Sequence, residues 1–323
     1  MDKAAFAEAL NHYGGNRTPC FFLIDFEMQK PVVMPLDECA SRNIFFNING
    51  FGNLQAQTLE QPVVKLIRHA PLQSLYLQQF NQVYRHLLLG DSFLTNLTIR
   101  TKIEISNSLQ ELFHISRSRY KLLYQDEFLT FSPETFIRMQ DQKIFAYPMK
   151  GTIDAGIPQA RQRILSDPKE MAEHVTIVDL IRNDLSQVAS GVHVSRFRYI
   201  DEINTQQKQL LQVSSVVEGV LSDDYRNKLG DILLALLPAG SVSGAPKPKT
   251  LEVIAAAEGE PRGYYTGVFG YFDGRNLDSA VIIRYIENRS GEYFYRSGGG
   301  ITTQSEVEKE FQEALDKIYV PVD

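Results

Sequence analysis

Between residues 264 and 297 short strands follow one another across tight turns, and this pattern constrains the fold most. Strands are predicted at 264–272, 278–286 and 292–297. Neighbouring strands joined by short turns pair antiparallel. Helices are predicted between the remaining strands, at 168–188, 226–237, 248–258 and 304–318. The sequence therefore predicts an α+β fold of antiparallel sheets with flanking helices rather than a parallel doubly wound sheet.

Composition excludes several classes of protein. The net charge is −6 and the chain has no basic run, which argues against nucleic acid and acidic membranes as partners. The apolar run 232–237 is far too short to cross a membrane, and the N-terminus has no signal-peptide pattern. Cys20 and Cys39 lack metal or redox spacing, which is typical of reduced packing residues. We therefore expect a cytoplasmic protein with no nucleic-acid or membrane partner.

Three glycines precede a charged helix near the C-terminus. They predict a turn whose backbone N–H groups bind an anion, and they are Gly298, Gly299 and Gly300. On the helix that follows, Glu310, Glu313 and Lys317 lie within roughly 60° of arc, at the edge of its apolar stripe. Carboxylates one turn apart suit a hard divalent cation. The alternative is that the three charged side chains form a solvated salt-bridge ladder.

A second acidic pair lies on the helix predicted to begin at Pro168, with Asp167 as its N-cap. Glu170 and Glu173 stand three residues apart on a helix that is apolar nearly all round, so we expect it to be buried. Buried carboxylates need a partner. The two acidic pairs therefore predict Mg²⁺ bridging an anionic ligand. His174 fits a hydrogen-bonded core residue better than a metal ligand.

Two further clusters carry chemistry. Lys150 stands between an apolar stretch and a glycine, and desolvation would lower its pKa and make the amine a nucleophile or base. Glu134, at the end of a strand, would supply the matching acid or base. Lys150 also fits an ordinary turn residue. Ser241 lies in GSVSGAPK at 240–247, where small hydroxylated residues lead into a helix and either face a ligand or cap that helix.

The motifs together resemble the chorismate-utilising enzymes, which include the large subunits of anthranilate synthase and aminodeoxychorismate synthase. The resemblance rests on SPE at 132–134, PMKGT at 148–152, VDLIRNDL at 178–185, GSVSGAPK at 240–247, PRG at 261–263, SGGGI at 297–301 and EKEFQEALDK at 308–317. It covers about residues 90–319 and implies the chorismate-binding fold of anthranilate synthase component I. We expect residues 1–89 to be a short N-terminal part integrated with the catalytic region 90–323 in one compact domain.

The resemblance also implies roles for individual residues. Glu173 and Glu313 resemble direct Mg²⁺ ligands, with Glu170 and Glu310 acting through bound water. The metal would anchor the ring carboxylate of chorismate beside the glycines. The residues that resemble the family's substrate-binding groups are Thr152, Ser241, Tyr265, Arg284 and Lys317, together with Gly298, Gly299 and Gly300.

Within the family, Lys150 in PMKGT is typical of aminodeoxychorismate synthase component I, whereas anthranilate synthases have alanine there. Leu94 stands where the isomerising synthases have a lysine and amination enzymes often have glutamine, and Gln212 stands where most members have histidine. The implied reaction converts chorismate and ammonia to 4-amino-4-deoxychorismate through a lysine adduct, with Glu134 as acid, for p-aminobenzoate and folate synthesis. The alternatives are anthranilate synthase component I and a non-catalytic metal-binding regulatory protein.

The source of nitrogen is expected to be a separate subunit. Glutamine hydrolysis by the common amidotransferases needs a nucleophilic cysteine beside a histidine base. Neither Cys20 nor Cys39 lies in a nucleophile-elbow pattern. The sequence therefore predicts ammonia as the immediate nitrogen donor, supplied by a glutamine amidotransferase partner.

Overall fold

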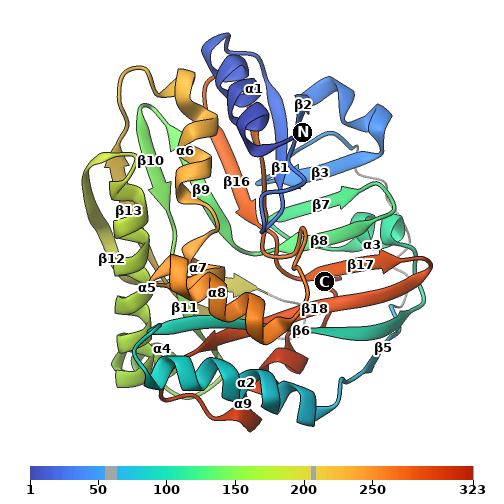
Figure 1. The fold of residues 1–323 in the computed structure, drawn as a ribbon, viewed down its shortest axis with the longest axis vertical. Helices are drawn as coiled ribbons and strands as arrows, with labels where there is room; N and C mark the ends of the chain where they lie inside the picture. Colours follow the sequence, from blue (N-terminus) through green and yellow to red (C-terminus); the bar gives the residue numbers. More distant parts are fainter. Residues whose placement is uncertain (55–63, 205–208, 323) are drawn as a thin grey trace.

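The computed structural model describes residues 1–54, 64–204 and 209–322, and within them the chain forms two nine-stranded sheets (Figure 1). The paired strands of both sheets run antiparallel, and helices flank them. The α+β architecture predicted from the hairpin-like strand pattern is confirmed.

The first sheet begins near the N-terminus and includes the strand that directly follows Glu134 and the strand that carries Lys150. Its strands are β1 (Cys20–Ile24), β2 (Val32–Pro35), β9 (Thr135–Gln140), β10 (Lys143–Ala146), β11 (Met149–Asp154), β12 (Ser190–Asn204), β13 (Gln209–Val220), β15 (Val268–Phe272) and β16 (Leu277–Val281). Their order is β11-β13-β10-β9-β16-β15-β1-β2, with β12 also paired to β13. Strand β1 pairs with β15, so the N-terminal segment is built into the same sheet as residues near 270.

The second sheet carries the glycine-rich strand. Its members are β3 (Ile44–Ile48), β4 (Phe51–Gly52), β5 (Leu66–His69), β6 (Leu94–Ile105), β7 (Tyr120–Tyr124), β8 (Phe128–Ser132), β14 (Gly244–Ala245), β17 (Tyr285–Arg289) and β18 (Glu292–Ile301). Their order is β14-β6-β18-β17-β8-β7-β3-β4, with β5 also paired to β6. The long pairing of β6 with β18 forms the part of the sheet that faces the C-terminal helix.

Helices cover both sheets. They are α1 (Lys3–Gly15), α2 (Gln73–Leu88), α3 (Leu109–Ile115), α4 (Ala160–Ser166), α5 (Pro168–Ser186), α6 (Leu229–Leu236), α7 (Gly240–Ser243), α8 (Lys247–Glu258) and α9 (Val307–Asp316), with 3₁₀ turns at Leu36–Glu38, Ala40–Arg42 and Tyr225–Lys228. Helix α5 packs on β11, β12 and β13, whereas α2, α8 and α9 gather at β6 and β18 (Figure 1). No helix in the described ranges is both long and apolar enough to cross a membrane.

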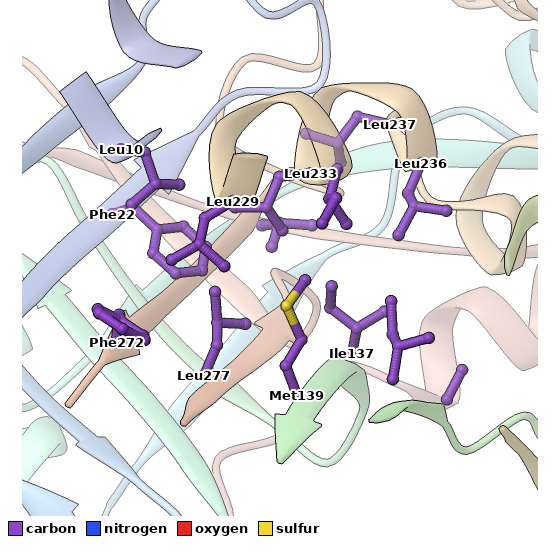
Figure 2. Close-up of a cluster of buried hydrophobic side chains, with 14 of the residues drawn as sticks. Leu10, Phe22, Ile137, Met139, Leu229, Leu233, Leu236, Leu237, Phe272 and Leu277 are labelled. Carbon is purple, nitrogen blue, oxygen red and sulfur yellow. The ribbon is translucent and has the colours of Figure 1, made fainter. Parts of the chain in front are cut away.

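A hydrophobic core lies between the first sheet and the helices α1 and α6 (Figure 2). Leu229 and Leu233 of α6 pack there with Phe272, Leu277 and Met139 of the sheet. Each fully buried side chain of this kind stabilises the fold by roughly 1.5–3 kcal/mol. A second core fills the space between β6, β18 and the helices α2, α8 and α9. The strands and helices that border the site are therefore anchored on well-packed cores.

Helix α5 begins as predicted but is less buried than predicted. The side chain of Asp167 accepts a hydrogen bond from the Glu170 N–H at 3.0 Å, which caps the helix at Pro168. Met171 and Val175 remain 37% and 47% exposed, so the expectation of burial nearly all round is wrong. The reason is that α5 packs with one side on β11, β12 and β13 at one end of the first sheet, and no described element covers its outer side.

The segment 278–286, predicted as one strand, is divided between the two sheets. Strand β16 ends at Val281 in the first sheet, and β17 starts at Tyr285 in the second. Between them, Arg284 has a φ of +56°, in the left-handed region that residues other than glycine seldom adopt. The chain therefore crosses from one sheet to the other at this point, and Arg284 marks the crossing.

Candidate active site

The three glycines lie inside a strand rather than in a turn. Strand β18 continues to Ile301, and the residues opposite Gly298, Gly299 and Gly300 are Thr98, Leu97 and Asn96 of β6. The prediction of a turn is wrong because pairing with β6 overrides the weak strand propensity of glycine. On the other edge of β18, β17 pairs only with residues 292–296. Beyond that point no other described strand occupies this edge, so backbone groups there can receive a ligand.

The glycines differ in what surrounds them. A Cβ at Gly298 would lie 2.3 Å from the carbonyl oxygen of Leu97, so only glycine allows β6 to approach this closely. A Cβ at Gly299 would instead lie 3.5 Å from Glu310 Oε2 and 3.6 Å from both Glu313 Oε1 and Lys317 Nζ. The strand at Gly299 therefore directly faces the charged side of α9, as the sequence predicted for these two segments.

Lys317 joins α9 to the glycine strand. Its Nζ donates to the Gly298 carbonyl and contacts Glu313 Oε1, both at 2.7 Å. Burial lowers the pKa of Lys317, and the neighbouring charges of Arg284 and Lys150 act in the same direction. Burial alone would raise the pKa of Glu313, but the charges of Lys317, Lys150 and Lys169 and the hydrogen bond from Lys317 together lower it. The salt bridge between Lys317 and Glu313 is what the alternative of a salt-bridge ladder predicts. The hydrogen bond from Lys317 to the Gly298 carbonyl, however, places this pair at the glycine strand.

Lys150 on β11 faces the acidic residues of α5. Its Nζ lies 2.8 Å from Glu173 Oε2. Burial alone would lower the pKa of Lys150, but the charges of Glu173, Glu313 and Glu170 outweigh burial and raise it. The expected lowering of the pKa is therefore wrong in this arrangement. The sequence argument considered desolvation and could not see that the lysine is surrounded by carboxylates.

Glu170 holds a buried carboxylate oxygen without a partner. Its Oε2 accepts no hydrogen bond and lies 2.6 Å from the position a Cβ would take at Gly151. Burial raises the pKa of Glu170, and the neighbouring charge of Glu173 raises it further. An unpartnered buried carboxylate oxygen fits a site that takes a cation or an ordered water.

The four glutamates form two pairs that share a neighbour rather than one closed cluster. In the described part of the chain, no three acidic, histidine or cysteine side chains converge closely enough to hold a metal ion. The charge of Lys150 acts on both pairs, Glu170 with Glu173 on α5 and Glu310 with Glu313 on α9. The donors are hard oxygen ligands of the type Mg²⁺ prefers, and the positive charge between them is at present that of Lys150.

His174 is a core residue, as predicted. It is fully buried, and its Nε2 lies 2.7 Å from Ser215 Oγ. Burial and the charge of Arg198 lower the pKa of His174 to about 4, so the ring is neutral. The residue therefore holds α5 against β13, beside the backbone of Lys150, and adds no charge to the acidic site.

Glu134 lies where the chain passes from β8 to β9, and its carboxylate accepts a short hydrogen bond from Ser241 Oγ. The backbone is fixed there because the Glu134 carbonyl accepts from the Val281 N–H at 3.1 Å. Burial raises the pKa of Glu134, although Ser241, Arg284 and Lys317 act against the rise. A carboxyl group with a raised pKa keeps its proton closer to neutral pH, which suits a general acid.

An open groove of about 710 Å³ runs beside α9. Its lining includes Thr152, Arg284, Glu313, Lys317 and Tyr319. The guanidinium of Arg284 lies over the ring of Tyr319, 5.4 Å from its centroid, which gives the groove a cationic wall. The structure thus brings four of the predicted binding or metal residues to one groove.

Tyr265 lies deeper than the groove. It is 4% exposed, and burial raises the pKa of its hydroxyl to about 12. Its ring packs 5.7 Å from that of Tyr285, and the guanidinium of Arg296 lies 5.6 Å from its centroid. The hydroxyl is therefore a neutral hydrogen-bonding group behind the groove.

The two positions that depart from the family pattern both border the site. A Cβ at Gly300 would lie 2.9 Å from Leu94 Cδ1, so an apolar side chain covers this glycine. Gln212 on β13 stands opposite Thr152 on β11, which lines the groove. Both departures therefore change the walls of the site and leave its charged residues in place.

Sequence reasoning missed two ion pairs that hold the site from behind, one fully buried and one largely buried. Lys247 Nζ lies 2.9 Å from Asp184 Oδ1, and Arg262 contacts Glu258 at 2.6 Å. Arg262 also donates to the Val242 carbonyl at 2.8 Å, next to Ser241. The available signal was that Asp184, Lys247 and Arg262 lie within the motifs that carry the family resemblance.

The chain matches known proteins along most of its length. Residues 40–323 match the family described as chorismate binding enzyme. A Haemophilus influenzae protein named "Uncharacterized PabA-like protein" is 48% identical over 318 residues, covering 98% of this chain and 97% of that protein. Anthranilate synthase component 1 1 of Haloarcula marismortui is 36% identical over 247 residues, and aminodeoxychorismate synthase component 1 of Bacillus subtilis is 30% identical over 257 residues. These two matches cover 71% and 75% of this chain and 48% and 53% of the relatives.

The fold also matches solved structures. The crystal structure of anthranilate synthase component I from Streptococcus pneumoniae superposes with a TM-score of 0.68 at 26% identity, covering 83% of this chain and 61% of that chain. The fold and these matches define the chain as a chorismate-utilising enzyme. It belongs to the chorismate binding enzyme family.

Proposed function

We propose that this protein converts chorismate and ammonia to 4-amino-4-deoxychorismate, as an aminodeoxychorismate synthase component I. The observation that carries the proposal is the position of Lys150, whose Nζ contacts Glu173 at 2.8 Å. An amine held between the two acidic pairs lies where a substrate anchored by them would be within reach. An anthranilate synthase of the family has alanine at this position and adds ammonia directly to the ring.

Magnesium is proposed as the cofactor. Glu173 and Glu313 would bind it directly, and Glu170 and Glu310 would act through water. The unpartnered Oε2 of Glu170 supports this assignment, because a buried carboxylate oxygen without a donor favours a cation nearby. When bound, the ion would neutralise the ring carboxylate of chorismate.

The charge of the site controls the lysine. In the structure the carboxylates raise the pKa of Lys150 and hold its amine protonated. Once the carboxylate charge is compensated, burial is the remaining influence, and burial lowers the pKa of a lysine. The free amine can then act as a nucleophile. The carboxylates that keep Lys150 protonated in this arrangement would no longer do so once the bound ion compensates their charge.

The chemical steps use Lys150 and Glu134. The Lys150 amine attacks the ring carbon next to the carboxylate-bearing carbon, and the 4-hydroxyl leaves as water with the proton of Glu134. Ammonia then adds at the 4-position, and the lysine leaves as the ring double bonds return. Burial raises the pKa of Glu134, which favours the protonated form that a general acid requires.

Binding of chorismate would use the cationic side of the groove. Arg284 and Lys317 carry positive charge beside Thr152, which suits the enolpyruvyl carboxylate and its neighbouring oxygens. Backbone groups at Gly298, Gly299 and Gly300 would hold the ring carboxylate. Ser241 would orient Glu134, and Tyr265 would provide a neutral hydroxyl behind the substrate.

Two other functions compete with this proposal. Anthranilate synthase component I has the same fold, and a relative with that name is 36% identical to this chain. Lys150 favours amination at the 4-position over it. The other is a non-catalytic metal-binding regulator. The presence of Lys150, Glu134 and the four glutamates argues against it.

A glutamine amidotransferase is the proposed partner. A relative that is 48% identical carries the name PabA-like. This chain itself offers no reactive thiol, because Cys20 and Cys39 are both free and fully buried, and burial raises the pKa of each to about 12. Ammonia from the partner would be used in the cytoplasm for p-aminobenzoate and folate synthesis.

Product identification tests the proposal. The purified chain is incubated with chorismate, Mg²⁺ and an ammonium salt, and the product is identified by mass and retention time. The expected product is 4-amino-4-deoxychorismate. Anthranilate would show the alternative synthase, and chorismate that is bound but unchanged would show the regulatory protein.

A further inference from the structure

A narrow cavity lies behind Glu134, on the side where the first sheet meets α5 and α7. Its volume is about 30 Å³, and its wall includes Glu134, Asp184, Ser241, Ala146 and Val281. A water molecule needs roughly 10–15 Å³ of such space. The cavity therefore has room for one or two molecules the size of water.

Glu134, Asp184 and Ser241 on the cavity wall offer hydrogen-bond acceptors, and Thr135 and Tyr147 add hydroxyls that can donate or accept. Ser241 gives its hydrogen to Glu134, so its oxygen is left with acceptor capacity. Lys247 engages Oδ1 of Asp184 at 2.9 Å. The other oxygen, Oδ2, lies 2.8 Å from where a Cβ would be at Gly240, the residue before Ser241. The carboxyl groups of Glu134 and Asp184 therefore both lie against α7, the short helix that carries Ser241.

Gly240 makes this arrangement possible. A Cβ there would also lie 3.1 Å from the Leu180 side chain of α5, so a larger residue would push α5 away from α7. The glycine lets the Asp184 carboxylate approach the Ser241–Glu134 pair. The remainder of the wall is mostly apolar, with Ala146, Ile181 and Val281 among its members.

We propose that this cavity binds ammonia, the second substrate of the proposed function, on which this inference rests. Ammonia has three N–H donors and one lone pair, which fits the acceptors of Glu134, Asp184 and Ser241 and leaves the lone pair to face the reacting carbon. The apolar remainder of the wall favours neutral ammonia, the nucleophilic form, over the ammonium ion. The cavity opens beside Glu134, the group that has just given up its proton.

The chemistry balances within the site. The ammonia nitrogen forms a bond to the 4-carbon, and the electrons of the bond between Lys150 and the ring return to the lysine nitrogen. One proton passes from the added nitrogen to the carboxylate of Glu134, which replaces the proton given to the leaving hydroxyl. The sum is chorismate plus ammonia to aminodeoxychorismate plus water, with no oxidant or reductant.

The test compares the KM for ammonium with the KM for chorismate in matched variants. Asp184→Asn exchanges one acceptor for a donor, and Lys247→Met removes the ion pair but leaves both oxygens of Asp184. Ala146→Val fills the cavity without changing a polar group, and Ala280→Val makes the same change in another core cluster. We expect Asp184→Asn and Ala146→Val to raise the KM for ammonium roughly tenfold or more, with the KM for chorismate unchanged and the Ala280→Val control near wild type for both substrates.

Other outcomes overturn the inference in distinct ways. An unchanged KM for ammonium in Asp184→Asn and Ala146→Val shows a cavity that holds only water. Equal losses in Asp184→Asn and Lys247→Met, affecting both substrates alike, show that Asp184 only supports the fold. If Asp184→Asn does not fold, the comparison of the KM for ammonium between Ala146→Val and Ala280→Val decides the question. If the wild-type chain makes no aminated product from chorismate and ammonium, both the proposed function and this inference are refuted.

Discussion

Replacing Gly299 by alanine should separate the binding role of the glycine strand from its role in folding. A methyl group at Gly299 would lie 3.5–3.6 Å from Glu310 Oε2, Glu313 Oε1 and Lys317 Nζ, which is ordinary contact distance. The fold should therefore tolerate it, with a change in unfolding free energy within about 0.5 kcal/mol. The methyl group would nevertheless occupy the face where we place the substrate's ring carboxylate.

Gly298→Ala is the matched control, because it adds the same methyl group one residue earlier. Its Cβ would lie 2.3 Å from the Leu97 carbonyl oxygen, more than about 1 Å inside normal contact. Overpacking of this kind costs roughly 1–3 kcal/mol, so we expect its Tm to fall by roughly 2–10 °C. Gly299→Ala should instead keep its Tm and lose roughly tenfold or more in affinity, the worth of one hydrogen bond to a charged group.

Thermal unfolding and calorimetric titration with chorismate, with Mg²⁺ and without ammonium, give both quantities. Wild-type affinity in Gly299→Ala would refute the placement of the carboxylate beside this strand. A Tm as low as that of Gly298→Ala would show that the space around Gly299 is smaller than the structure indicates. Loss of affinity at an unchanged Tm is the result that supports the assignment.

Three further predictions concern the metal, the nitrogen source and the acid. Activity should vanish with EDTA and return with Mg²⁺, but not in Glu313→Ala; full activity of that variant in chelator would refute the metal assignment. The chain alone should use ammonium and not glutamine, because Cys20 and Cys39 are fully buried with raised pKa values; glutamine-dependent turnover by the pure chain would contradict this. The hydrogen bond from Ser241 lowers the pKa of Glu134, so Ser241→Ala should raise that pKa and shift the alkaline limb of the kcat–pH profile upward. A limb that stays in place or moves down would exclude Glu134 as the acid.

Local signals in the sequence predicted what local interactions determine. Asp167 and Pro168 predicted the start of α5, because N-cap and first-turn preferences act within a few residues. The spacing of Glu310, Glu313 and Lys317 placed all three on one side of α9 next to the glycines, and Gly299 does face them. Their common orientation follows from helix geometry alone.

Features that depend on distant parts of the chain could not be predicted. Gly298–Gly300 became a strand because β6 pairs with them across some 200 residues of sequence. The change of sheet at Arg284 depends on a left-handed backbone that an arginine does not signal. The raised pKa of Lys150 arises from carboxylates on two helices that the fold brings to it. Each is a tertiary effect that outweighs a correct local expectation.

The role of Lys150 as a nucleophile is the central claim, and a covalent adduct tests it most directly. The chain is incubated with chorismate and Mg²⁺ without ammonium and quenched, and its intact mass and peptides are measured. We predict a protein heavier by chorismate less one water, with the added mass on Lys150 and none in Lys150→Ala, which should lose turnover by orders of magnitude while still binding chorismate. Wild-type formation of aminodeoxychorismate by Lys150→Ala would contradict the account.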